Sequence, residues 1–156
     1  PRQHSRQCLH DISGSTVAYC HEDREKASTG RKGERKTLVF EERRTCRKPE
    51  WTALELGDRE GFDVLSWVDG SIKSDSLRVE VKASSKELEH ATFFLTRNEW
   101  GKATLGGAHV FHLWPEVYSD EEEPIIVTVE GMKPHVPIDT GDGKWGDAEI
   151  PMAAFL

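Results

Sequence analysis

Two segments with alternating side chains constrain the fold of this chain more than any other feature. Residues 62–68 read Phe-Asp-Val-Leu-Ser-Trp-Val, and residues 77–83 read Leu-Arg-Val-Glu-Val-Lys-Ala. Both segments are rich in branched and aromatic residues, which favour strands. Between them, Asp69-Gly70 and Lys73-Ser74-Asp75 are typical of a turn. The two segments therefore predict a β-hairpin.

The register of this hairpin brings two carboxylates together. If the turn centres between residues 71 and 72, Asp63 lies opposite Glu80, and opposed side chains have Cβ atoms roughly 5 Å apart. Carboxylates this close repel each other unless a cation lies between them. Mg²⁺ typically takes one or two carboxylates together with phosphate oxygens and water. One hypothesis is therefore a Mg²⁺ or Mn²⁺ site at Asp63 and Glu80, with Lys82 on the same strand face as Glu80.

Lys82 would then hold a water nucleophile or stabilise charge that develops on a phosphate. The alternative is an ordinary exposed strand face. The chain has 31% charged residues, and the alternation of Arg78, Glu80 and Lys82 is also typical of a solvent-facing strand with weak cross-strand ion pairs. Spacing alone leaves both interpretations open.

Further segments complete the expected fold. A helix is predicted over residues 29–47, with Thr29 as N-cap and Glu34 on its buried side as a possible third carboxylate. Strands are predicted over residues 92–95, 108–114 and 125–129. Thr96 and Glu99 fit a capping box for a helix that runs past Ala103. No element is assigned beyond residue 132. The order predicts an α/β or α+β domain, with a mixed sheet flanked by helices.

The charge of the 156-residue chain is unevenly distributed. The net charge is −7, but residues 31–48 carry eight basic and three acidic residues, whereas residues 116–156 carry two basic and ten acidic ones. A protein that coats nucleic acid non-specifically is usually basic throughout, so the overall charge counts against that role. The basic segment still allows a restricted phosphate contact. No apolar run approaches the 18 residues of a membrane-spanning helix.

The chain divides into three parts by composition. Residues 1–28 are interpreted as a polar lead-in or linker, residues 29–114 as the folded domain, and residues 115–156 as an acidic extension with Pro and Gly that packs on the domain. Because the chain begins at Pro1, we expect it to belong to a larger protein. Three cysteines cannot form a full disulfide framework, which favours a reducing compartment.

Cysteine and histidine residues near the N-terminus raise the question of a zinc site. The candidates are His4, Cys8, His10, Cys20 and His21. Their pairs are more closely spaced than the usual zinc-binding pairs, so the alternatives are a zinc site and an ordinary lead-in segment. His109, His112 and His135 are expected to be packing or surface residues.

Four motifs occur in an order that resembles a known family. They are Gly30-Arg31-Lys32-Gly33-Glu34, Gly61-Phe62-Asp63-Val64-Leu65-Ser66, Val79-Glu80-Val81-Lys82-Ala83-Ser84 and Phe94-Leu95-Thr96-Arg97-Asn98-Glu99-Trp100. Together they resemble the PD-(D/E)XK nuclease superfamily, and most closely the branch found at the C-terminus of the plant protein NO VEIN and in bacterial restriction and defence proteins. The likeness spans about residues 30–114. Phe62, not Pro, precedes the Asp.

The resemblance implies a restriction-endonuclease-like fold and a Mg²⁺-dependent or Mn²⁺-dependent nuclease. It implies Asp63 and Glu80 as metal ligands, Lys82 as the catalytic lysine and Glu34 as an accessory acid. The expected partners are nucleic acid, with DNA favoured, and the rest of a parent or complex protein, with no membrane. Contacts to nucleic acid are expected from Arg31, Lys32, Arg35 and Asn98.

The expected location is the cytoplasm, or the nucleus in a eukaryote. The alternative function is a catalytically inactive module of the same fold that binds nucleic acid or a protein.

Overall fold

The described chain forms one long helix and two β-sheets. The structure is a computed structural model that describes the backbone of residues 13–52 and 61–156, and the side chains of residues 24–52 and 61–156. Its elements are α1 (Ser13–Thr45), β1 (Glu50–Trp51), β2 (Val64–Trp67), β3 (Ser76–Ala83), β4 (Thr92–Thr96), α3 (Arg97–Ala103), β5 (Ala108–Trp114), β6 (Ile125–Thr128), α4 (Val129–Met132) and β7 (Asp147–Pro151), with 3₁₀ helices η2 (Lys133–His135) and η3 (Met152–Phe155).

The larger sheet has five strands in the order β1-β2-β3-β5-β6. Strands β3 and β5 pair in parallel, and the other neighbours pair antiparallel. This is the mixed sheet that the sequence predicts, and the α+β class is confirmed. Strands β2, β3, β5 and β6 lie within two residues of the predicted segments. The smaller sheet pairs β4 with β7 in antiparallel fashion.

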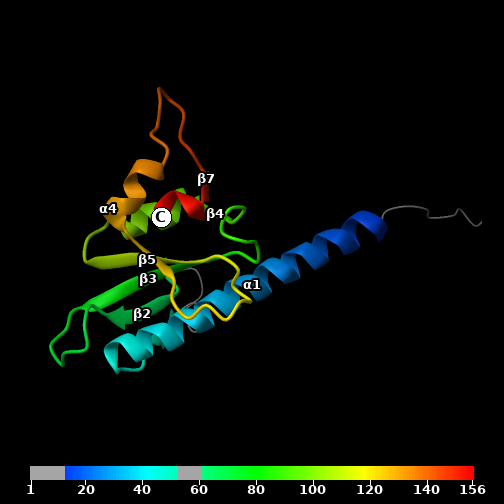
Figure 1. Ribbon diagram of the computed structural model, residues 1–156. Coiled ribbons are helices and arrows are strands. Elements are labelled where there is room, and N and C mark those ends of the chain that lie inside the picture. The colour runs from blue at the N-terminus through cyan, green and yellow to red at the C-terminus, as the bar shows by residue number, and fades with distance from the viewer. Residues whose placement is uncertain (1–12, 53–60) are drawn as a thin grey trace, which may run out of the picture.

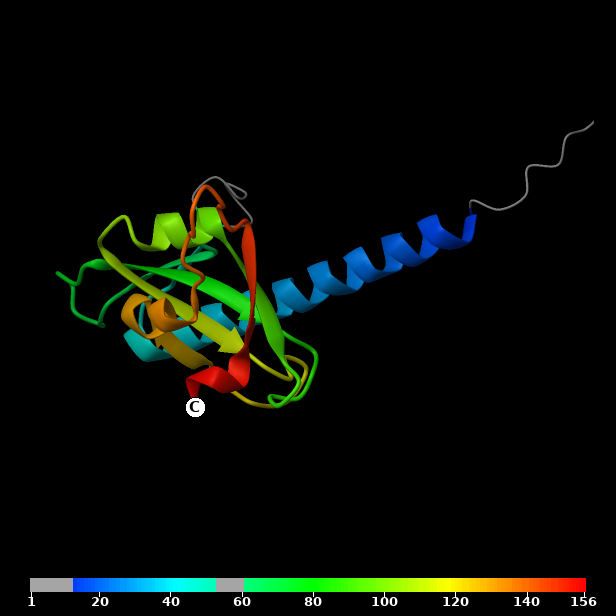
Figure 2. The same ribbon diagram turned by 90° about the horizontal axis from the view of Figure 1, so that it is seen from above.

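The elements are arranged in layers around the five-stranded sheet (Figure 1). Helix α1 covers one face, where Leu38 packs against Val64, Leu77 and Val79. The other face carries α3, α4 and the β4–β7 sheet, as the view from above also shows (Figure 2). Between these layers lies the larger core, which includes Phe93, Leu95, Phe111, Leu113, Val127, Met132, Ile150 and Met152. Both faces of β3 are therefore covered.

Helix α1 is longer than the sequence predicts. The helix predicted over residues 29–47 is confirmed as far as Thr45, but its predicted start with Thr29 as N-cap is wrong, because the helix already begins at Ser13 and runs for 33 residues. Its N-terminal turns lie beyond the edge of the sheet (Figures 1 and 2). A stretch that has no face to bury shows no apolar period, so sequence periodicity cannot detect it. Gly30 and Gly33 also lower the helix propensity at the apparent start.

Gly33 allows α1 to approach the sheet closely. A Cβ atom at this position would lie 2.7 Å from the Cβ of Ala83 and 3.2 Å from Cγ1 of Val81. At Gly30, the nearest atom would be Oε1 of Glu34 at 4.0 Å. Of the two glycines in the first motif, the second is therefore required by packing.

A matched pair of substitutions tests this requirement. Gly33→Ala is expected to lower the free energy of unfolding, because overpacking costs about 1–3 kcal/mol and the gain in helix propensity offsets only about 1 kcal/mol of it. Gly30→Ala makes no such clash and should be neutral or stabilising. Urea unfolding of both variants gives the difference, and equal stabilities would contradict the close contact.

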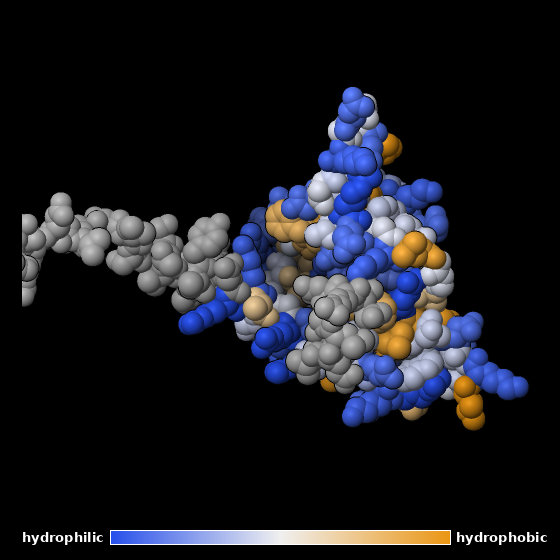
Figure 3. Space-filling view, turned by 180° about the vertical axis from the view of Figure 1, so that it is seen from behind, coloured by the Kyte–Doolittle hydropathy of each residue, from blue (hydrophilic) through white to orange (hydrophobic). Residues whose placement is uncertain are grey.

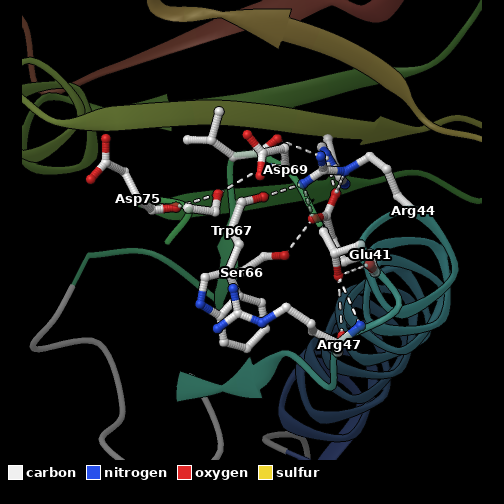
Figure 4. Close-up of polar contacts among 11 residues, drawn as sticks. Glu41, Arg44, Arg47, Ser66, Trp67, Asp69 and Asp75 are labelled. Carbon is white, nitrogen blue, oxygen red and sulfur yellow. Dashed lines mark hydrogen bonds and ion pairs between the residues drawn. The ribbon is translucent and has the colours of Figure 1, made fainter. Parts of the chain in front are cut away.

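The C-terminal turns of α1 are anchored to β2 by a buried polar cluster (Figure 4). Glu41 is fully buried and accepts hydrogen bonds from the Ser66 hydroxyl and from the Arg44 guanidinium. Arg44 also donates to the carbonyls of Trp67 and Val68. The carboxylate is thus paired on both sides, which a buried charge requires. The cluster holds α1 in one position across the sheet.

The acidic C-terminal segment contributes strands to both sheets. Within residues 115–156, β6 pairs with β5 and β7 pairs with β4. The strand predicted over residues 125–129 is present as β6, whereas the sequence predicts neither β7 nor the two 3₁₀ helices. In β7 only Ile150 is buried, so this strand lacks the clear apolar alternation that would reveal it.

Candidate active site

The predicted hairpin places Asp63 and Glu80 side by side. Val64 pairs with Val79, which is the register that sets Asp63 opposite Glu80. Asp63 lies just before β2, where its backbone N–H donates to the Val79 carbonyl and its Oδ2 accepts from the Val81 N–H at 2.8 Å. Its side chain is therefore held across the end of the hairpin.

Glu80 and Lys82 point into the layer between the sheet and α3. Glu80 is 5% exposed, and the Lys82 side chain is 12% exposed. The interpretation of this strand face as solvent-facing is therefore wrong. Burial on both faces of β3 comes from α1 on one side and α3 with β4 on the other, and neither packing contact is visible in the local alternation.

Lys82 bridges two carboxylates. Its Nζ lies 2.9 Å from Oε1 of Glu80 and 2.9 Å from Oε1 of Glu99. Glu99 also forms the predicted capping box: its second oxygen accepts from the Thr96 N–H at 2.7 Å, and the Thr96 hydroxyl accepts from the Glu99 N–H. One side chain thus caps α3 and positions the lysine. The sequence indicates Glu99 mainly as a cap and does not place it among the expected site residues, although it belongs to the fourth motif.

Burial sets the protonation of the two hairpin carboxylates. Loss of hydration raises the pKa of Glu80 to about 8 and that of Asp63 to about 6. For Lys82, burial acts to lower the pKa, but Glu80 and Glu99 outweigh it and raise the pKa above its usual value. For Glu99, Lys82 and the Thr96 hydrogen bonds outweigh burial and lower the pKa. Lys82 is therefore a cation at neutral pH.

Glu34 reaches the same region from α1. Its carboxylate accepts a hydrogen bond from the Trp51 indole N–H, and its charge contributes to the raised pKa of Asp63. The charge of Glu34 thus acts on Asp63, and its role as a third carboxylate of the site stays a prediction. Glu34 lies close to β3 because it directly follows Gly33, the residue at which α1 approaches the strand most closely.

The other predicted contact residues lie at the surface. Arg31, Lys32 and Arg35 are exposed on α1, and Asn98 is exposed on α3 beside Glu99. The Asn98 side chain makes no hydrogen bond with another residue of the described chain. These four positions remain predictions for nucleic-acid contacts.

The donor set is suited to a hard divalent cation. Asp63 and Glu80 supply carboxylate oxygens and no sulfur or nitrogen. Their raised pKa values show that the surrounding residues do not fully stabilise the ionised carboxylates, which a bound cation would do. Mg²⁺ needs only one or two carboxylates when phosphate and water complete its shell. Within residues 24–52 and 61–156, no group of three or more His, Cys, Asp or Glu side chains forms a closed metal site. The two carboxylates fit an ion whose coordination shell is completed by substrate phosphate and water.

A family model described as "Protein NO VEIN, C-terminal" matches residues 33–128. The match covers well over half of the chain. This chain belongs to the NO VEIN C-terminal domain family. No curated protein and no solved structure matches it significantly.

The NO VEIN C-terminal match contains the whole cluster. It begins at Gly33, which seats α1 on β3, and ends at Thr128, the last residue of β6. Glu34, Asp63, Glu80, Lys82 and Glu99 all lie inside these limits. The pairing of β4 with β7 lies partly outside the match, because β7 begins at Asp147.

Two histidines within the NO VEIN C-terminal region are packing residues, as predicted. His109 and His112 are buried, and none of their ring nitrogens has a hydrogen-bond partner among the described residues. Burial lowers the pKa of each to about 4, so both are neutral at pH 7. His112 lies beside Glu41, on the α1 face of the sheet, away from Lys82. The third, His135, is exposed and stacks on Phe155.

The question of an N-terminal zinc site lies outside the described residues. His4, Cys8 and His10 fall in the undescribed segment, and the side chains of Cys20 and His21 are not described either. Among the helices that the structure does describe, none combines the length and apolarity needed to cross a bilayer.

The pKa of Glu80 predicts a pH-dependent stability. Because the folded protein holds this proton more tightly than the unfolded chain does, stability is lost as pH rises toward about 8. His109 and His112 act in the opposite direction, but only between about pH 4 and 6.5. Asp63, with its pKa raised to about 6, is half titrated at that pH, and its contribution fades above about pH 7. Without metal, the melting temperature should therefore fall between pH 6.5 and 8.

Glu80→Gln provides the control for this pH dependence. The variant has no proton to lose at this position, so its melting temperature should be nearly flat over the same interval. Differential scanning fluorimetry in EDTA measures both proteins. An equal fall in wild type and variant would assign the effect to another group.

Proposed function

We propose that this domain is a metal-dependent nuclease that hydrolyses phosphodiester bonds in DNA, within a restriction-type or defence-type protein. The observation that carries the proposal is the convergence of Asp63, Glu80 and Lys82 in one buried cluster at the end of the hairpin. Two buried carboxylates with raised pKa values beside a lysine are typical of a functional site. Membership of the NO VEIN C-terminal family supports it, because the matched region contains every residue of this cluster.

The proposed chemistry assigns each residue a task. Asp63 and Glu80 would hold Mg²⁺ or Mn²⁺. When bound, the ion would neutralise phosphate charge and lower the pKa of a water molecule. Lys82, held as a cation by Glu80 and Glu99, would stabilise the negative charge that develops on the phosphate. Glu99 would position Lys82, and Glu34 would act as an accessory acid near Asp63.

A plasmid-nicking assay tests this function. The chain is incubated with supercoiled DNA in Mg²⁺, in Mn²⁺ and in EDTA, and a parallel reaction contains single-stranded RNA. Conversion of supercoiled to open-circular DNA that depends on the metal supports the proposal. RNA cleavage without DNA cleavage would change the substrate class.

One observation favours the alternative of an inactive module. Lys82 is already engaged by two carboxylates at 2.9 Å, so substrate or metal must replace part of this pairing before the lysine can act. An inactive module would show neither cleavage nor Mn²⁺-dependent thermal stabilisation, whereas an active site should be stabilised by Mn²⁺ even in the absence of DNA.

A further inference from the structure

Two groups of basic residues on α1 and its C-terminal end have different surroundings, and the exposed Lys26 and Lys48 belong to neither group. In the first group, the charges are engaged by the protein itself. Lys36 donates to the carbonyls of Ser119 and Val117, and Arg43 pairs with Glu122 at 2.6 Å. Arg44 is bound in the Glu41 cluster, and Arg47 lies 3.8 Å above the centre of the Trp67 ring. These four residues are poorly placed to bind an external anion.

The second group consists of four cations on the exposed part of the helix. They are Arg24, Arg31, Lys32 and Arg35. All four are exposed, and none forms an ion pair with a carboxylate in the described chain. Positions 24, 28, 31 and 35 follow the spacing of one helix face, so three of the arginines form a row. Hydrophilic side chains gather where α1 leaves the body (Figure 3).

These cations line a hollow on the surface. It has a volume of about 470 Å³ and is bounded by the four cations together with Ala27, Ser28 and Tyr118. The Tyr118 hydroxyl lies within hydrogen-bonding distance of Ser28 and Thr29, which joins the loop after β5 to the helix. A hollow lined by four exposed cations and two hydroxyl groups is complementary to phosphate oxygens.

The row of cations leads to the candidate active site. Arg35 lies over the Trp51 ring at 5.9 Å, and the same indole donates to Glu34 beside Asp63. From Arg35 to Arg24 the helix rises about 16 Å, which is about five base-pair steps of B-DNA. A substrate strand in the active site could therefore continue along α1.

An acidic segment limits this surface on the other side. Residues 119–122 line a second hollow together with the cations Lys32, Arg35, Lys36 and Arg43, so Lys32 and Arg35 belong to both hollows. Glu122 neutralises Arg43. Burial and the charge of Lys32 lower the pKa of Lys36, and the charges of Glu121 and Asp120 oppose this shift without reversing it. Phosphates would be repelled from that flank and accepted on the row of arginines.

We propose that the α1 pocket formed by Arg24, Ser28, Arg31, Lys32, Arg35 and Tyr118 binds the phosphate backbone of DNA over about five base-pair steps, starting at Arg35 on the side of the catalytic cluster, and that residues 120–122 border it. The identity of the ligand rests on the proposed nuclease function. Binding of phosphate in the α1 pocket does not require a metal ion.

The test measures binding of a fluorescent 20-base-pair DNA duplex by anisotropy in EDTA, between 50 and 200 mM NaCl. The quadruple variant Arg24→Gln, Arg31→Gln, Lys32→Gln and Arg35→Gln changes only exposed side chains. Each lost phosphate contact should reduce the slope of log K against log salt by about 0.9. The loss of four contacts should therefore reduce it by about 3.6, with affinity at least about tenfold lower at low salt.

A charge-matched control removes four exposed lysines elsewhere, by Lys73→Gln, Lys86→Gln, Lys133→Gln and Lys144→Gln. It should leave the slope within about one unit of wild type. Glu122→Gln should raise the affinity, because it frees Arg43. Equal losses of affinity and salt slope in the two quadruple variants, or the absence of DNA binding by the wild type, would refute the proposal that this pocket binds DNA. If the nicking assay fails but the slope difference persists, only the catalytic proposal is lost.

Discussion

Asp63→Asn is expected to abolish Mg²⁺-dependent cleavage while it leaves the fold intact. The asparagine Oδ1 can still accept the hydrogen bond from the Val81 N–H. It removes, however, the negative charge that would bind the cation. Metal ions supply several kcal/mol of transition-state stabilisation, and each 1.4 kcal/mol is tenfold in rate, so the loss should be at least about a hundredfold.

The stability of the Asp63→Asn variant gives an independent readout. Burial raises the pKa of Asp63, which means that its charged form is disfavoured in the folded protein. A neutral amide should therefore leave the melting temperature unchanged or raise it in EDTA, and should remove the stabilisation by Mn²⁺. Asp75→Asn, at an exposed position of the same hairpin, is the matched control. Cleavage that survived in Asp63→Asn would refute the assignment of this residue as a ligand.

Lys82→Met is expected to abolish cleavage by a different route. It removes the cation that would stabilise charge on the phosphate, an effect of at least about a hundredfold. Unlike Asp63→Asn, it keeps both hairpin carboxylates and releases Glu80 from its ion pair. Stabilisation by Mn²⁺ should therefore be retained or increased. Together the two variants separate metal binding from charge stabilisation.

The folding cost of Lys82→Met needs its own control. Removing one partner of a buried ion pair costs about 3–5 kcal/mol, and here Glu80 and Glu99 both lose their partner. In the double variant Lys82→Met with Glu99→Gln, only Glu80 remains as a carboxylate without a cationic partner. The double variant should therefore recover part of the stability, with a coupling of about 0.5–3 kcal/mol between the two substitutions in the free energy of unfolding. It should remain inactive. If recovery of stability restored cleavage, Lys82 would have a structural role only.

Glu99 shows how a correct local prediction can miss a functional one. The pattern of Thr96 and Glu99 predicts the capping box, and both of its hydrogen bonds are present. A carboxylate has two oxygens, and the cap uses one of them. The other faces Lys82 only because α3 packs over β3, which brings together residues 17 positions apart. Sequence spacing contains no information about that contact.

In the basic segment, residues 31–48, the sequence likewise predicts the kind of contact but not which residues make it. Its eight cations are equivalent in sequence, and any of them could contact phosphate. The structure engages Lys36, Arg43, Arg44 and Arg47 in contacts with distant loops and strands, and leaves Arg31, Lys32 and Arg35 exposed. The helical period assigns residues to faces of α1, but it does not say which face meets the acidic segment.

The sequence alone determined the hairpin, its register and the strand class of the central segments. It did so because side-chain alternation, turn residues and capping residues act over a few positions. The position of Asp63 opposite Glu80 therefore follows from the spacing of residues along the chain. What only the tertiary structure decided was the burial of that pair, the partners of Lys82, the start of α1 and the pairing of β7. Each depends on contacts between segments far apart in the chain, and such contacts set the dielectric surroundings that give the carboxylates their raised pKa values.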